Sequence, residues 1–266
     1  MVVNCLRGFE FIGDWALYYF NLAGRMGLFM LRAIVATIVP PYRLEPLINQ
    51  IHFIGAKSLF VIVFTGAFTG MVLGLQGYYS LRQFGSESAL GSAIGLSLVR
   101  ELGPVLTALM VTGRAGSAIC AEIGIMRNTE QIDALECMAI DPFKFLIAPK
   151  LVAAIISLPI LTAFFNVVGI LGGYIIAVPV LGVNEGAYFQ GMYQSVVWDD
   201  LYMGLVKSLA FALIIIVVCA SKGFYVHLDR AGGFGAEGVS RVTTSAVVLS
   251  SVAILVCDYL ITAILL

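Results

Sequence analysis

The stretch Glu122–Pro142, EIGIMRNTEQIDALECMAIDP, concentrates charge in a chain that otherwise has little. It holds six of the 31 Asp, Glu, Lys and Arg residues, whereas 60% of the 266 residues are hydrophobic and the mean hydropathy is +0.99. Soluble domains are typically about 45–50% apolar and about 25% charged. The composition therefore excludes a soluble fold, and it predicts an all-α polytopic membrane protein whose spans lie on either side of this polar stretch.

The polar stretch itself belongs outside the lipid. A charged residue at the bilayer centre costs roughly 2.5–3.5 kcal/mol on insertion scales, so burying all six would cost well over 10 kcal/mol. Uncharged runs near the length of about 20 residues that a transmembrane helix needs flank it. We expect about five spans, with the third kinked near Pro159: Leu59–Leu81, Ser88–Gly113, 150–185, Leu201–Ser221 and Val242–Leu266.

The N-terminal region has a different pattern. Residues Phe9–Val39 are apolar but contain Arg25 and Arg32, which are seven residues apart and so share one helical face. That pattern is typical of a helix lying in the membrane interface with its arginines at the headgroups, and Pro40–Pro41 would end it. We expect an interfacial amphipathic helix within residues 1–45 and a transmembrane domain over residues 46–266.

The distribution of Lys and Arg predicts the topology. Residues 1–58, 114–150 and 222–241 hold twelve of them, whereas 76–88 and 184–200 hold one. Cytoplasmic loops carry the excess of basic residues. The N-terminus and the polar stretch are therefore predicted to be cytoplasmic, and the C-terminus is predicted to face the opposite side.

The polar stretch also has helical features. Asn128 with Gln131 three residues later resembles an N-terminal capping box, and Asp141–Pro142 is typical of the end of one helix and the start of the next. We predict an amphipathic helix over Asn128–Ile140. Its net negative charge would be repelled by an anionic membrane surface, which favours docking onto another protein. A solvated helix without a partner remains the alternative.

Three ionisable residues interrupt the apolar spans: Arg100, Glu101 and Lys207. Helical rise places Glu101 and Lys207 at similar depths, roughly 18 and 21 Å from the cytoplasmic ends of their spans. We hypothesise that these two form an ion pair and that Arg100 faces an outward-opening lipid cavity, where it would meet a phosphate group. The alternative is that all three only hold helices together.

The end of the first span, GMVLGLQGYYS, contains a row of small residues at Gly70, Gly74 and Gly77. Such a row permits close helix contact or leaves room for an acyl chain, and the pattern leaves both open. Leu75 and Tyr78 are predicted to line the lipid cavity near a dimer axis, with Tyr78 at the interfacial depth that aromatic rings favour.

The sequence lacks the motifs that several kinds of chemistry require. The five cysteines form no C-x-x-C pair, so we expect no metal or redox site. The net charge of −1 gives no basic surface for nucleic acid. A phosphate-binding P-loop is missing from the sequence, so any ATP hydrolysis must belong to another subunit. We predict no catalytic residue and no enzymatic activity in this chain.

Three segments carry a resemblance to a known family: GMVLGLQGY at 70–78, RELGPVLTALMVTGRAGSAICAEIGIMRNTEQIDALECMAIDP at 100–142, and PKLVAAIISLPILTAFFNVVGILGG at 149–173. They resemble the MlaE-type permeases of bacterial Mla and Mce phospholipid transporters. Residues 1–45 and 184–200 match no motif of that family.

The resemblance implies a permease of the inner membrane that works as a homodimer. It implies partners of four kinds: phospholipid, two ABC-type ATPase subunits that carry ATP and Mg, a ring of periplasmic MCE-domain proteins and, as is often found in the family, a small STAS-domain protein. The activity implied is phospholipid transport between the inner and outer membranes, which maintains outer-membrane lipid asymmetry. The cytoplasmic helix would be the coupling helix, and these residues would contact the ATPase: Glu122, Arg127, Glu130, Asp133 and Glu136.

The main alternative is an ion-coupled secondary transporter of a lipid or another amphiphile. Charged residues at mid-depth fit such a carrier, but the sequence shows no self-similar halves. A lone carrier also has no need for a cytoplasmic docking helix. An intramembrane serine protease is disfavoured because both histidines, His52 and His227, fall in segments predicted to be cytoplasmic.

Overall fold

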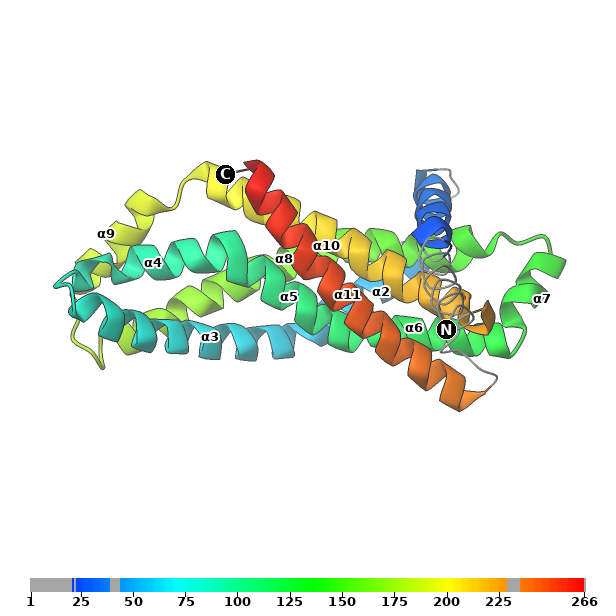
Figure 1. The fold of residues 1–266 in the computed structure, drawn as a ribbon, viewed down its shortest axis with the longest axis horizontal. Coiled ribbons are helices and arrows are strands. Elements are labelled where there is room, and N and C mark those ends of the chain that lie inside the picture. The colour runs from blue at the N-terminus through cyan, green and yellow to red at the C-terminus, as the bar shows by residue number, and fades with distance from the viewer. Residues whose placement is uncertain (1–20, 22, 39–43, 229–234, 266) are drawn as a thin grey trace, which may run out of the picture.

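The computed structural model describes residues 21, 23–38, 44–228 and 235–265. These residues form an elongated bundle of helices, with a short helix at each end, α7 at one and α9 at the other (Figure 1). No strand occurs within these ranges. Five helices in them are long and apolar enough to cross a membrane. The all-α polytopic architecture is confirmed.

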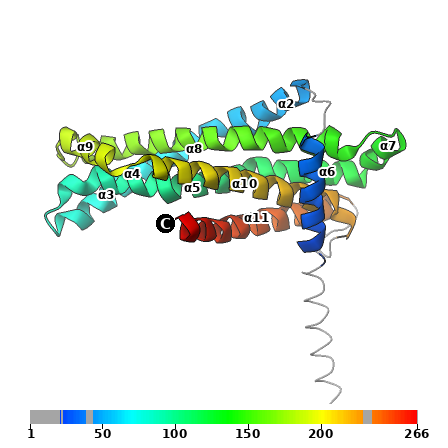
Figure 2. The same cartoon turned by 90° about the horizontal axis from the view of Figure 1, so that it is seen from above.

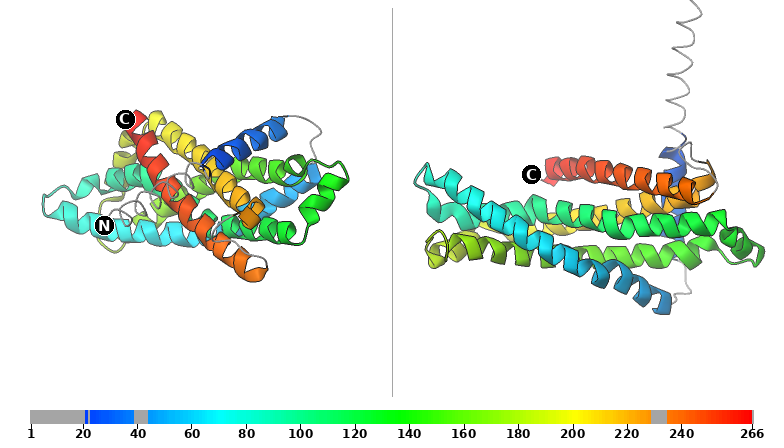
Figure 3. Two further views of the ribbon diagram at one scale, coloured as in Figure 1. Left: turned by 45° about the vertical axis from the view of Figure 1, so that its right-hand side comes forward. Right: turned by 90° about the horizontal axis from the view of Figure 1, so that it is seen from below.

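The five long helices correspond to the five expected spans. Each begins before the expected first residue, and the third ends at Ala177, short of residue 185. They are Leu44–Arg82 (α2 Leu44–Ile51, η1 His52–Ala56 and α3 Lys57–Arg82), Glu87–Asn128 (ending in α5 Gly103–Val111, η4 Thr112–Gly116 and α6 Ser117–Asn128), Phe143–Ala177 (η5 Phe143–Ile147 and α8 Ala148–Ala177), α10 Trp198–Phe224 and α11 Ala236–Leu265. Pro159 lies inside α8, which continues through it. Helix α11 runs obliquely across the bundle and packs on α10 and α6 (Figures 1 and 3).

Glycines bring α3 and α8 into close contact. A Cβ atom on Gly70 would overlap the carbonyl oxygen of Gly169, and one on Gly74 would lie 3.1 Å from the carbonyl oxygen of Gly173. A Cβ on Gly77 would lie 2.7 Å from the side chain of Leu90. The row of small residues therefore serves helix packing, which decides between the two roles that the sequence left open.

The described part of the N-terminal region is helical over residues 23–38 and crosses the long axis of the bundle (Figures 1 and 2). Its Phe29 is fully buried, with its ring 5.1 Å from that of Phe143 and 5.9 Å from that of Phe224. Leu28 and Leu31 are exposed. This orientation agrees with a helix lying in the membrane plane. The predicted segment before residue 21 and the Pro40–Pro41 helix end lie outside the described residues.

The predicted helix Asn128–Ile140 is wrong in its bounds. Asn128 is the last residue of α6, and α7 spans only Gln131–Cys137. Asn128 does not cap α7, because Glu130 adopts a left-handed conformation (φ 58°) that turns the chain between the two helices. The Asn128 amide instead donates to the carbonyl of Gly235 at 3.3 Å.

The helix boundary predicted at Asp141–Pro142 is confirmed. Asp141 Oδ1 accepts the backbone N–H of Phe143 at 2.9 Å, so Asp141 caps the helix that begins at Pro142. Proline is tolerated at a first helical position because its missing N–H would have no partner there. The third long helix therefore begins where Asp141–Pro142 indicated.

Residues 184–200, for which the sequence offered no family motif, contain a helix of their own. Helix α9 spans Glu185–Ser195 and is capped by Asn184, whose side chain accepts the N–H of Ala187 at 3.1 Å. Tyr188 is buried and donates to the carbonyl of Ile170 at 3.0 Å. These contacts fix α9 to the end of the bundle opposite α7.

Candidate functional site

Two widened turns of the second long helix carry charged residues. Within Glu87–Asn128, the π-helical turn η3 Leu98–Leu102 carries Arg100 and Glu101, and η4 carries Arg114. Such π turns are rare and are often found at functional sites. The turn at η3 places two ionisable side chains at the centre of the bundle's polar contacts.

Lys207 is the centre of a buried polar network. Its side chain is fully buried, and its Nζ lies 2.6 Å from Glu101 Oε2 and 2.8 Å from Asp258 Oδ1. It also donates to the carbonyl of Arg100 at 2.9 Å, and the Thr262 hydroxyl donates to Glu101 Oε1 at 3.1 Å. The predicted Glu101–Lys207 pair is therefore present, and it belongs to a larger network that joins three of the long helices.

Sequence reasoning missed Asp258 and Thr262 as members of this network. Asp258 interrupts the last apolar run, and ionisable residues inside spans usually pair with one another. Looking for an oppositely charged partner for each charge inside the spans would have identified Asp258 as a partner of Lys207. Thr262 follows it by one helical turn and carried no signal of its own.

Arg100 also has a partner that the sequence did not reveal. Its Nε lies 2.6 Å from Oδ1 of Asp200, which is buried near the start of α10. The other Asp200 oxygen accepts the backbone N–H of Val197 at 3.0 Å, so the carboxylate also caps α10. The available signal was the Asp199–Asp200 pair directly before the fourth apolar run.

An open cavity adjoins Arg100. It has a volume of about 320 Å³, and its lining comes mainly from the start of α10 together with the end of α11: Arg100, Val197, Asp199, Asp200, Tyr202, Met203 and Leu265. The Arg100 side chain is 33% exposed, so it can pair with Asp200 and still face the cavity.

Leu75 and Tyr78 do not line this cavity. Leu75 lies on the outer surface of α3, and Tyr78 is buried against its neighbours. The Tyr78 ring lies 5.8 Å from the Tyr79 ring and 5.8 Å from the Arg82 guanidinium. The structure therefore does not bring these two residues together with Arg100 in a single chain, and their contact with lipid stays a prediction.

Ion pairs hold α6, α7 and α8 together at the α7 end. Arg127 Nη1 lies 2.7 Å from Asp133 Oδ1, and its guanidinium also lies 5.3 Å from the ring of Phe224. Lys150, which is almost fully buried, lies 2.7 Å from Glu122 Oε2. Burial, and after it the charge of Arg127, lower the pKa of the nearby His227 imidazole and so favour its neutral form.

The remaining acidic residues at this end are exposed. Glu130 and Glu136 take part in none of the ion pairs found among the described residues. Apolar side chains accompany them on the surface, with Ile125 53% and Met138 62% exposed, whereas Ile132 is fully buried and anchors α7. The five residues expected to contact an ATPase therefore divide into three that pair within the chain and two that are available to a partner.

Metal ligation finds no support in the described part of the chain, where no group of three His, Cys, Asp or Glu side chains is placed to hold an ion.

Comparison with known proteins supplies the family. The model of the family described as Permease MlaE matches residues 47–264. The chain is 45% identical to a probable ABC transporter permease protein of Rickettsia bellii, over 90% of each chain. It is 39% identical to the intermembrane phospholipid transport system permease protein MlaE of Haemophilus influenzae, over 100% of this chain and 98% of that protein.

The similarity extends to a more distant bacterium. A probable ABC transporter permease protein of Synechocystis is 37% identical over 80% of this chain and 78% of its own length. The family model covers all five long helices apart from residues 44–46 and 265, and it includes the charge network and α7. The chain is a multi-pass membrane protein and belongs to the MlaE permease family.

Proposed function

We propose that this chain is the permease subunit of an ABC-type transporter that moves phospholipid between the inner and outer membranes and so maintains outer-membrane lipid asymmetry. The observation that carries the proposal is the surface at the α7 end, where exposed acidic and apolar side chains are held on a firmly anchored short helix. Similarity to the intermembrane phospholipid transport system permease of Haemophilus influenzae supports phospholipid as the substrate class.

In this proposal α7 is the coupling helix that engages a partner ATPase in the cytoplasm. Glu130, Glu136 and the exposed Met138 supply charge and apolar area for docking, and Ile132 anchors the helix to the bundle. The partner carries ATP and Mg and hydrolyses the ATP. The Arg127–Asp133 and Lys150–Glu122 pairs transmit movement of α7 to α6 and α8.

A homodimer would explain the exposure of charge within the spans. The side chains of Arg100 and Glu101 are 33% and 39% exposed in a single chain, although both lie in a long apolar helix. Charged side chains in such helices normally face the bundle interior or a water-filled cavity. A second copy would enclose these residues in a shared cavity, where Arg100 would meet the lipid phosphate and Leu75 and Tyr78 would contact acyl chains.

The proposed topology follows the distribution of Lys and Arg. The N-terminus and α7 lie in the cytoplasm, the protein resides in the inner membrane, and α9 faces the periplasm. A ring of MCE-domain proteins would then bind at the α9 end, and a STAS-domain protein would bind the ATPase.

One observation favours a second candidate, an ion-coupled carrier. Two carboxylates, Glu101 and Asp258, share the single ammonium group of Lys207, which leaves one excess negative charge among these groups. Ionisable side chains inside spans are what ion-coupled transporters use to bind their ions. A carrier, however, gives no role to the exposed surface at the α7 end.

Copurification separates the two functions. Changing both Glu130 and Glu136 to Lys should abolish copurification of an ATPase, because it reverses the charge of the docking surface without breaking an internal ion pair. The matched control is Glu185→Lys, an acidic residue of α9 at the opposite end, which should leave copurification unchanged.

Reconstitution completes the test. Vesicles that contain the purified complex should transfer phospholipid only when ATP is supplied. If the chain purifies alone and moves lipid in response to an ion gradient, the proposed function is wrong and the carrier takes its place.

A further inference from the structure

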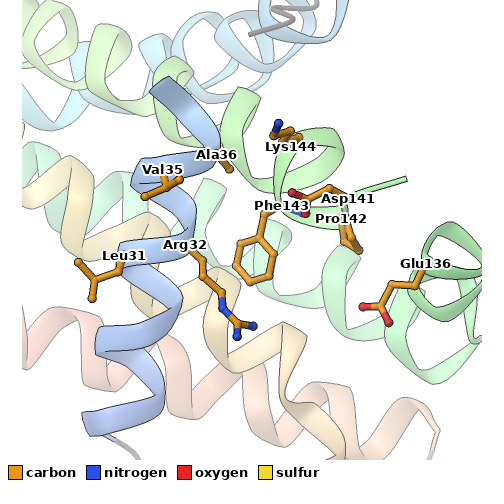
Figure 4. Close-up of a pocket in the computed structure, with 9 residues that line it drawn as sticks. All are labelled: Leu31, Arg32, Val35, Ala36, Glu136, Asp141, Pro142, Phe143 and Lys144. Carbon is orange, nitrogen blue, oxygen red and sulfur yellow. The ribbon is translucent and has the colours of Figure 1, made fainter. Parts of the chain in front are cut away.

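A second groove lies at the α7 end, away from the cavity beside Arg100. It has a volume of about 490 Å³ and is formed by the helix at residues 23–38, the end of α7 and the start of the third long helix (Figure 4). The lining residues are Leu31, Arg32, Val35, Ala36, Glu136, Asp141, Pro142, Phe143 and Lys144.

The groove has an apolar side and a polar side. In Figure 4, Leu31 and Val35 lie on one side and Glu136 on the other, with Arg32 between them beside the Phe143 ring. Leu31 and Val35 are 62% and 60% exposed. This division matches an amphiphile at the membrane surface, whose chains would lie along the apolar side and whose headgroup would lie at the polar side.

The charges of the groove are balanced but not paired with one another. Two cations, Arg32 and Lys144, lie with two anions, Glu136 and Asp141. Within the described residues, none of the ion pairs involves Arg32, Lys144 or Glu136, and Asp141 uses one oxygen to cap the backbone at Phe143. Arg32 and Glu136 project from opposite walls of the groove (Figure 4).

This pattern selects among headgroups. An anionic headgroup would be attracted by the two cations but repelled by the two carboxylates. A cationic headgroup would be attracted by the carboxylates but repelled by the cations. A zwitterion places each of its charges next to the opposite charge. A primary ammonium group can donate hydrogen bonds to carboxylates, whereas a quaternary choline has no N–H to donate.

We propose that this groove binds an amine-bearing zwitterionic phospholipid of the leaflet at the α7 end, with its phosphate at Arg32 and Lys144 and its ammonium at Glu136 and Asp141. The site is distinct from the proposed transport cavity and does not depend on it. A lipid held there connects the helix at residues 23–38 to the segment that carries α7, and so stabilises the position of that segment.

Lipid retention tests the proposal. The purified full-length complex is placed in vesicles of equal parts phosphatidylethanolamine, phosphatidylglycerol and phosphatidylcholine and re-extracted in mild detergent, and the lipid retained per chain is measured by mass spectrometry. We expect phosphatidylethanolamine to be enriched. Changing both Arg32 and Lys144 to Ala should weaken its binding roughly tenfold or more, as expected for loss of charge-assisted hydrogen bonds.

Controls distinguish this site from nonspecific attraction. Arg25→Ala removes a cation from the same helix but outside the groove, and it should leave the enrichment unchanged. Arg32→Glu should abolish the enrichment, and adding Glu136→Arg should restore part of it, because a zwitterion can bind in the reverse orientation. This rescue also shows that a loss in the single variant is not caused by misfolding.

Three outcomes would overturn the proposal. The first is that phosphatidylglycerol is enriched as strongly as phosphatidylethanolamine. The second is that changing both Arg32 and Lys144 to Ala leaves the enrichment of phosphatidylethanolamine undiminished. The third is that a photoreactive side chain at Val35 captures a protein in the assembled complex instead of a lipid. These outcomes are read from the bound lipid and not from ATP-dependent transport. Glu136 is shared with the proposed ATPase-docking surface, so the variants at Arg32 and Lys144, which lie outside that surface, keep the two proposals separate.

Discussion

The network around Lys207 and the surface at the α7 end are both rich in charge but differ in how it is used. Inside the spans, Lys207 contacts two carboxylates and a backbone carbonyl and is fully buried. At the α7 end, Glu130 and Glu136 are exposed, and the pairs that do exist hold the short helix in place. The paired charges inside the spans therefore support the fold, whereas the exposed Glu130 and Glu136 at the α7 end are available for recognition.

Replacing Lys207 by Met should have the largest effect on stability. It leaves two carboxylates without their cation, of which Asp258 is only 18% exposed, and breaking a buried pair costs about 3–5 kcal/mol. The measurement is thermal unfolding in detergent. Lys57→Met, at an exposed lysine, should change the stability by less than about 0.5 kcal/mol. A triple variant that also carries Glu101→Gln and Asp258→Asn should recover much of the loss, and no recovery would contradict the network's role.

Arg100→Ala should have the next largest effect on stability. It removes the partner of the buried Asp200 carboxylate, which keeps only the Val197 N–H, and a hydrogen bond to a charged group contributes about 1.5–3 kcal/mol. Adding Asp200→Asn should remove most of that penalty in the same unfolding assay. An Arg100→Ala variant as stable as the parent would show that the pair does not support the fold.

Lys150→Met tests a buried cation at the α7 end. Its partner Glu122 is 45% exposed and can be solvated when the lysine is lost, so we expect a loss of only about 1 kcal/mol. The comparison with Lys207→Met is informative because both lysines are buried, but Lys207 has a second carboxylate partner, Asp258, which is only 18% exposed. Equal losses in the two variants would mean that this second, more buried carboxylate does not set the cost.

Changing Glu130 and Glu136 to Lys should have the smallest effect on stability, within about 0.5 kcal/mol, because both are exposed surface positions. The same change should nevertheless abolish copurification of the ATPase. Thermal unfolding and copurification, measured on one preparation, check both parts. A large loss of stability would show that these acidic residues belong to the fold and would remove the contrast between the two regions.

The spans and the Glu101–Lys207 pair were predictable from sequence because both follow from the cost of placing charge in lipid. The partners Asp258 and Asp200 were not found, since each lies near the end of an apolar run where a charge is unremarkable. The bounds of α7 were missed because Asn128 fits a helix start as well as a helix end, and only the left-handed Glu130 distinguishes the two. The groove at Arg32 depends on segments distant in sequence, which no local pattern brings together.

The glycine contact between α3 and α8 limits how this protein can move. Because backbone meets backbone at Gly70 and Gly169, the two helices have no side chains there that could change rotamer to let them slide or separate. They are expected to travel as one rigid body. Any widening that admits a lipid must then come from hinging of this pair against the rest of the bundle or against a second copy, and a cysteine crosslink that ties α3 to α8 should leave transport intact.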